Sequence, residues 1–285
     1  MIGRALMLLL GVSTLARAAW AWHPRAEAGI ETTAGPGGYL EAAADVSVEP
    51  LDPLLMWGRA ASVRLDGDTG TDTTAGAEFR PAEWVRGFGE YGRGSGPGAF
   101  DRTTWRLGGG TTLFPGPGPV VAVHLDATVE RTTHAVTVGG RRWDLLQEGL
   151  GLDLRVELGR RTEVSATWWT YRYDRDLGSV SRRLLVLSRR RRRPVFADAV
   201  SYVLELPRRA WGAGVALYPG AHVRVGYGLL RVEGEAGEEW GDAWIHRWDA
   251  DGTRGRFRAG AGIETYVRPE GTDTYVSLRV GVSFP

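Results

Sequence analysis

The chain has 285 residues, a length that one domain can accommodate. Lys plus Arg number 35 and Asp plus Glu number 34, and this near balance argues against a nucleic-acid-binding protein, which would carry a strongly basic surface. The sequence has no cysteine, which excludes thiolate metal sites and a thiol nucleophile.

Residues 1–21 have the three parts of a secretory signal peptide. Arg4 supplies a positive charge, a short apolar run follows, and a small-x-small cleavage site ends at Ala21. We expect the mature chain to begin at Trp22, with cleavage after Ala18 as the alternative. The apolar run is too short to span a bilayer, and no later segment has 18 consecutive apolar residues. The sequence therefore predicts export through the inner membrane without a transmembrane helix.

Residues 22–285 contain many segments in which apolar and polar residues alternate. In residues 149–158, for example, leucine and valine occupy one face while Gly, Asp, Arg and Glu occupy the other. Residues 39–48, 120–130 and 257–267 have the same pattern. A period of two is typical of a β-strand, and about 9–11 residues are enough for a tilted strand to cross a bilayer.

Short turns alternate along the chain with longer polar loops, as expected for a barrel with short periplasmic turns and longer outer loops. This pattern predicts about sixteen strands. The predicted strands are residues 25–33, 38–49, 54–65, 72–80, 83–92, 102–114, 118–131, 144–158, 162–173, 181–188, 195–206, 209–218, 221–233, 237–248, 253–267 and 272–284. About fourteen strands result if 181–188 and 237–248 are not strands, and about twelve if more segments merge.

The predicted fold class is all-β, a single transmembrane antiparallel up-and-down β-barrel over residues 22–285. The signal peptide, the strand lengths and the tryptophans and tyrosines near strand ends favour this fold. A soluble β-sandwich would show a similar alternation strand by strand and remains the alternative.

The last segment, residues 274–284, places five apolar side chains on one face and ends that series with Phe284. It resembles the C-terminal strand of Gram-negative outer-membrane β-barrel proteins, in which alternating apolar residues end in an aromatic residue. Here Pro285 follows the aromatic residue. The resemblance implies a porin-like barrel in the bacterial outer membrane, with Phe284 as an assembly signal and the barrel-assembly machinery as a partner. It does not identify a subfamily.

Motifs of enzymatic barrels do not occur in the sequence. Barrel lipases and deacylases place a His two residues before a Ser, and none of the five histidines has a Ser at that distance. Omptin-type proteases use an Asp-His pair, and no Asp directly precedes a His. We therefore predict neither enzyme activity nor a cofactor. His124, Asp126 and Glu130 share one predicted face and could suggest a metal site, but a hydrated wall is the favoured interpretation, with no metal.

The strongest charge feature is a run of arginines, which can grip lipid phosphates or an anionic partner, or lie in a solvated turn. The run consists of Arg189, Arg190, Arg191, Arg192 and Arg193. The sixteen-strand arrangement places it at the periplasmic rim, and the fourteen-strand arrangement places it outside. Outer-membrane lipids and lipopolysaccharide are expected partners, and nucleic acid is not.

The polar faces of the predicted strands line the expected lumen. The candidate pore-lining residues are Glu41, Asp45, Arg64, Arg106, His124, Asp126, Glu130, Asp153, Arg155, Arg224, Arg258, Glu264 and Arg279. Their mixed signs predict a hydrated lumen that selects weakly between anions and cations. A barrel of about sixteen strands leaves an aqueous channel unless it is plugged.

The leading functional hypothesis is a channel for passive passage of small polar solutes. One alternative is an export pore for a polysaccharide or other polymer, with export-system partners and with Tyr39 and Tyr266 in contact with sugars. Another alternative is a non-conducting structural or partner-binding barrel whose lumen is closed by Arg–carboxylate pairs.

Overall fold

The structure, a computed structural model, describes residues 25–51, 53–65, 68–96, 100–138, 141–175, 206–234, 242–269 and 271–284. These residues form β1 (Arg25–Ala34), β2 (Leu40–Leu51), β3 (Leu54–Leu65), β4 (Asp68–Ala82), β5 (Val85–Ser95), β6 (Phe100–Leu113), β7 (Val120–Val138), β8 (Arg141–Leu158), β9 (Thr162–Tyr173), β10 (Pro207–Gly220), β11 (Val223–Gly234), β12 (Ala243–Arg254), β13 (Phe257–Arg268) and β14 (Gly271–Phe284). The predicted signal peptide and the arginine run at 189–193 lie outside the described residues. No helix in the described part of the chain is long and apolar enough to cross a membrane.

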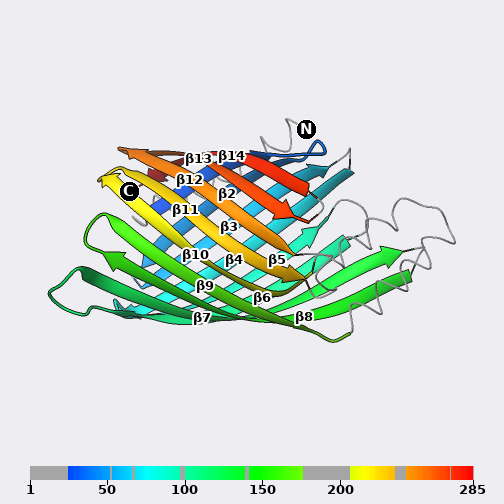
Figure 1. Ribbon diagram of the computed structural model, residues 1–285, viewed down its shortest axis with the longest axis horizontal. Coiled ribbons are helices and arrows are strands. Elements are labelled where there is room, and N and C mark those ends of the chain that lie inside the picture. Colours follow the sequence, from blue (N-terminus) through cyan, green and yellow to red (C-terminus); the bar gives the residue numbers. More distant parts are fainter. Residues whose placement is uncertain are drawn as a thin grey trace.

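The strands form one closed antiparallel barrel in which each strand pairs with its neighbours in the sequence (Figure 1). The first and last strands complete the circle, with a continuous register from Ala26 opposite Phe284 to Ala34 opposite Val276. Closure leaves no sheet edge with unpaired backbone groups. The predicted all-β up-and-down barrel is confirmed.

The barrel has fourteen strands rather than sixteen. The predicted strands at 181–188 and 195–206 lie almost entirely outside the described residues, and β9 pairs directly with β10, with Trp168 opposite Trp211. Because every strand of the closed order is paired on both sides, no edge remains for a further strand. Fourteen strands was the predicted alternative. That alternative omitted the predicted strand at 237–248, but residues 243–248 belong to β12.

The apolar face of the strands points outward. Leu107 is 61% exposed, Val129 54% and Leu278 60%. The buried apolar residues among those described are alanines, apart from Leu145 and Leu206, so the interior has no conventional hydrophobic core. An exposed apolar surface that runs around a closed barrel requires lipid rather than water as its surroundings.

The connections fall on two rims. The turn rim carries the start of β1, the end of β14 and the short connections, including residues 159–161 and 255–256. Gly159 and Gly255 have positive φ values of 60° and 61°, which a residue without a Cβ adopts readily. The opposite, loop rim differs from expectation at residues 132–142, which lie between the predicted strands 118–131 and 144–158. Most of them are strand, because β7 and β8 continue to lengths of 19 and 18 residues.

Candidate functional site

The polar face of the strands lines the lumen. Residues directly opposite each other in an antiparallel pair project from the same face of the sheet, so the strand register assigns each side chain to one face. The register places twelve of the thirteen candidate lumen residues on the inner face. They are Glu41, Asp45, Arg106, His124, Asp126, Glu130, Asp153, Arg155, Arg224, Arg258, Glu264 and Arg279.

Arg64 is the exception and faces outward. It pairs with Leu40, which is 47% exposed on the apolar outer face. Arg64 stands one residue before the end of β3, where a charged side chain reaches the aqueous or headgroup region even from the outer face. At strand ends, therefore, a polar side chain can lie on either face of the sheet. The prediction that Arg64 lines the lumen was wrong.

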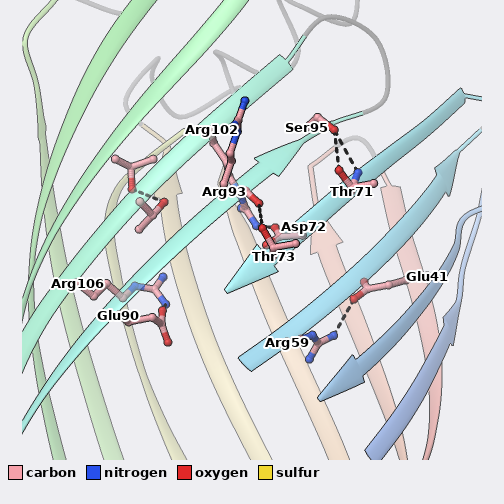
Figure 2. Close-up of polar contacts among 12 residues, drawn as sticks. Glu41, Arg59, Thr71, Asp72, Thr73, Glu90, Arg93, Ser95, Arg102 and Arg106 are labelled. Carbon is pink, nitrogen blue, oxygen red and sulfur yellow. Dashed lines mark hydrogen bonds and ion pairs between the residues drawn. The ribbon is translucent and has the colours of Figure 1, made fainter. Parts of the chain in front are cut away.

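Arg59 on β3 is an inward residue that the candidate set missed. It donates one hydrogen bond to Glu41 on β2, at 2.7 Å (Figure 2). It donates another to Glu31 on β1, at 3.3 Å. Small residues, Gly58 and Ala60, flank it, so the local alternation of polarity is weak. Its cross-strand register with Asp45 would have assigned it to the inner face.

Two further arginines hold carboxylates along the wall from β4 to β7. Arg106 donates to Glu130 at 2.6 Å and to Glu90 at 3.1 Å, and the second contact is visible in Figure 2. Arg86 donates through two nitrogens to Asp126, at 2.9 and 2.5 Å. Such two-point contacts fix the guanidinium plane as well as its position. Arg86 and Glu90 were also absent from the candidate set.

An arginine-rich cluster surrounds Asp251, whose side chain is 8% exposed. Arg279 donates two hydrogen bonds to this carboxylate, at 2.7 and 2.9 Å. Arg224 and Arg258 each lie 3.8 Å from it, and Arg224 also contacts Asp249. Asp251 and Asp249 were missed because outward tryptophans and alanines on β12 obscure the alternation.

A carboxylate-rich cluster on β8 and β9 shows the reverse balance. Glu157 and Glu163 face each other directly in the register, and Asp153 lies on the same inner face. Among the described residues, the arginine that forms an ion pair with this group is Arg155, whose Nε atom lies 3.9 Å from Glu163. Its Nε atom is buried without a hydrogen-bond partner among the described residues.

His124, Asp126 and Glu130 do share the inner face of β7, but each has its own partner. His124 contacts Glu157 and Thr112, both at 2.9 Å. The two carboxylates are held by the arginines described above, on β5 and β6. The three side chains do not converge on a common point where an ion would bind.

Inward aromatic rings lie against glycines on the neighbouring strand. A Cβ built on Gly151 would stand 2.4 Å from the Trp169 ring, and one on Gly108 would stand 2.4 Å from the Phe88 ring. These glycines therefore let the rings lie flat on the wall rather than project across the lumen. The signal for this arrangement is a glycine directly opposite an aromatic residue, which becomes visible only with the register.

Two cavities lie within the described part of the lumen. One, of about 740 Å³, is lined by β1–β3 and β11–β14, including Arg59, Asp251 and Tyr266. The other, of about 420 Å³, is lined on β5–β7 and β9–β11 and includes Phe88 and Trp169. The farthest-reaching ion pairs of the described wall, such as those from β3 to β1 and from β5 to β7, join next-neighbour strands and run along the wall.

Tyr39, in the connection between β1 and β2, donates a hydrogen bond of 2.7 Å to Glu41 at the loop rim. Burial raises the pKa of its hydroxyl above the ordinary value, and the bond to Glu41 raises it further. The hydroxyl therefore keeps its proton and remains engaged with the wall. Tyr266, the other predicted sugar contact, also donates to a wall carboxylate, that of Glu264.

A closed barrel with an apolar outer face, outward tryptophans and a charged, hollow interior belongs to the class of transmembrane β-barrels. Its fold is that of porin-like outer-membrane proteins. No protein-family model and no curated protein matches the sequence.

Among solved structures, Omp33 of Acinetobacter baumannii is similar, with a TM-score of 0.52 and 11% identity over 92% of this chain and 98% of Omp33. CdiB of Acinetobacter baumannii has a TM-score of 0.50 and 6% identity, and the alignment covers 92% of this chain and 60% of CdiB. The KdgM porin has a TM-score of 0.46 and 8% identity over 91% of this chain and 99% of that one. The likeness to Omp33 and CdiB establishes the shared fold.

Proposed function

We propose that this protein is a passive channel for small polar solutes in the bacterial outer membrane. The observation that carries the proposal is the arrangement of the inward charges. Arginines and carboxylates pair along the wall and leave cavities of about 740 and 420 Å³ beside them. A lumen closed by Arg–carboxylate pairs would need bridges between distant strands, so the non-conducting alternative has less support.

The size of the barrel is consistent with a hydrated lumen. Fourteen strands, about 4.8 Å apart and tilted by about 40°, close into a backbone cylinder of about 14 Å radius. Side chains fill the interior of an eight-stranded barrel, whereas barrels of 16–18 strands leave an aqueous channel. The inward aromatic rings lie against the wall, and the ion pairs run along it, so these side chains stay close to the backbone.

Single-channel recording in planar bilayers tests the proposal. We expect stable current steps from purified, folded protein, and liposome swelling should then give the largest sugar that passes. Heat-dependent mobility in a gel identifies the folded barrel, so a silent bilayer can be attributed to the folded state. Folded protein that produces neither current nor solute flux would overturn the channel.

An export pore for a polysaccharide is the second candidate, and the aromatic rings in the smaller cavity favour it. Phe88, Trp169 and Tyr171 all line this cavity. Aromatic side chains combine a large apolar surface with a polar edge, a surface against which a sugar ring can lie. Oligosaccharides added during recording should then interrupt the current for milliseconds, and a Trp169→Ala variant should shorten the interruptions. Currents unaffected by any oligosaccharide would favour the simple channel.

A further inference from the structure

A group of arginines faces away from the lumen at the loop rim of β7 to β10. Arg131 on β7 stands opposite Glu148 on β8, and Glu148 stands opposite Arg172 on β9. Arg209 on β10 pairs with Thr170, which places it diagonally next to Arg172. Directly opposite residues have Cβ atoms about 5 Å apart and diagonal neighbours lie about 7–8 Å apart. The four side chains therefore form one continuous surface, which we call the outer arginine patch.

The faces of the surrounding residues show that this patch lies on the outside. Arg131 stands opposite Trp105, which is 57% exposed, and Arg209 is two residues from the exposed Trp211. Below them on the same face, Val129, Leu150 and Val215 belong to the apolar surface. Along β10 the order from the middle of the barrel to the loop rim is therefore apolar, aromatic and cationic, and at β6 and β7 the aromatic residue stands directly opposite the cation.

The charge of the patch is positive. Its three guanidinium groups lie beside two carboxylates, those of Glu148 and of Glu233, which stands directly opposite Arg209 on β11. Outward residues at the turn-rim ends of the same strands are apolar instead, including Val121, Leu158 and Leu217. The patch therefore marks one rim and one side of the barrel.

We propose that the outer arginine patch binds the phosphate groups of an anionic lipid headgroup in the outer leaflet. Tryptophan rings prefer the boundary between acyl chains and headgroups, so the guanidinium groups beside and just beyond them lie within reach of the phosphates. Arginine contacts phosphate with two parallel N–H groups and is less strongly hydrated than lysine. This inference rests on the proposed outer-membrane location but not on conduction.

Native mass spectrometry of the detergent-solubilised barrel tests the patch with diphosphorylated lipid A, dephosphorylated lipid A and phosphatidylglycerol as probes. We expect the phosphorylated lipids to bind and the dephosphorylated one to bind more weakly. A charged side chain at a membrane surface changes affinity about fivefold. The combined Arg131→Gln, Arg172→Gln and Arg209→Gln variant should therefore lose roughly 100-fold in affinity.

Arg254→Gln is the matched control, because Arg254 is opposite the outward Phe257 at the turn rim. It removes an outward charge at the other end of the barrel and should leave lipid A affinity unchanged. Equal affinity of the triple variant and the unsubstituted protein for diphosphorylated lipid A would overturn the proposal. Displacement of the lipid by millimolar inorganic phosphate would also overturn it and assign the patch to free phosphate. Bilayer currents report separately on the channel, so either proposal can fail alone.

Discussion

The arginine-rich cluster on β11–β14 and the carboxylate-rich cluster on β8 and β9 line the same lumen with opposite balances of charge. In the first, three arginines surround Asp251. In the second, Asp153, Glu157 and Glu163 lie on one inner face, and Arg155 forms an ion pair with one of them, Glu163. A chain with a formal net charge of +1 thus separates its charges around the barrel. Mixed signs in a sequence do not imply a uniform field in the lumen, because the register decides which charges neutralise each other.

The largest expected effect comes from removing the centre of the arginine-rich cluster. Asp251→Asn should lower the free energy of unfolding by about 2–3 kcal/mol, because it removes the buried counter-charge of Arg258 and Arg279 and leaves Arg224 with Asp249 alone. Urea titration of the barrel in lipid vesicles, followed by tryptophan fluorescence, measures the change. Asp153→Asn is the comparison in the other cluster and should cost less than about 1 kcal/mol, since it relieves carboxylate repulsion. Equal losses would contradict the contrast between the clusters.

The next effect concerns an inward aromatic ring, that of Trp169, on the strands that carry the carboxylate-rich cluster. Gly151→Ala should cost about 1–2 kcal/mol, because the new methyl group would overlap the Trp169 ring, at 2.4 Å, and force it toward the lumen. The same variant should lower single-channel conductance. Gly228→Ala is the matched control, because the nearest atom to its Cβ, a backbone oxygen, is 4.0 Å away. A Gly151→Ala variant with unchanged stability and conductance would show that the ring has free space.

Ion selectivity sharpens the comparison further. Exchanging both Asp153 and Glu163 for their amides should lower the cation-to-anion permeability ratio by roughly twofold, because fixed charges in a lumen with low-dielectric walls concentrate counter-ions. Arg258→Gln should raise the ratio. Reversal potentials across a salt gradient give both values, at an ionic strength of about 0.1 M where the Debye length is about 10 Å. Shifts of the same sign in the two variants would show that the clusters do not act as separate charges.

The sequence predicted the barrel well because strand alternation is local. The segments at 120–130 and 149–158 are in β7 and β8 with the predicted faces. The strand count and the wall partners depend on non-local pairing, which one sequence does not contain. The strand count depends on the direct pairing of β9 with β10, which are far apart in the sequence. The arginines around Asp251 likewise come from three other strands. The faces of β12 were harder to predict, because tryptophans and aspartates both also occur at the ends of strands.

The smallest expected effect tests the register itself. Arg64 faces outward in the structure, whereas Arg106 faces the lumen between Glu90 and Glu130. Both substitutions, Arg64→Gln and Arg106→Gln, remove one positive charge. Only the second should change the reversal potential, because it frees two carboxylates inside the pore, while the first alters the outer surface near lipid headgroups. If Arg64→Gln shifts the reversal potential as much as Arg106→Gln does, β3 is displaced by one residue. A one-residue slip moves every side chain of a strand to the other face, so the whole inner surface assigned to β3, including Arg59, would then be wrong.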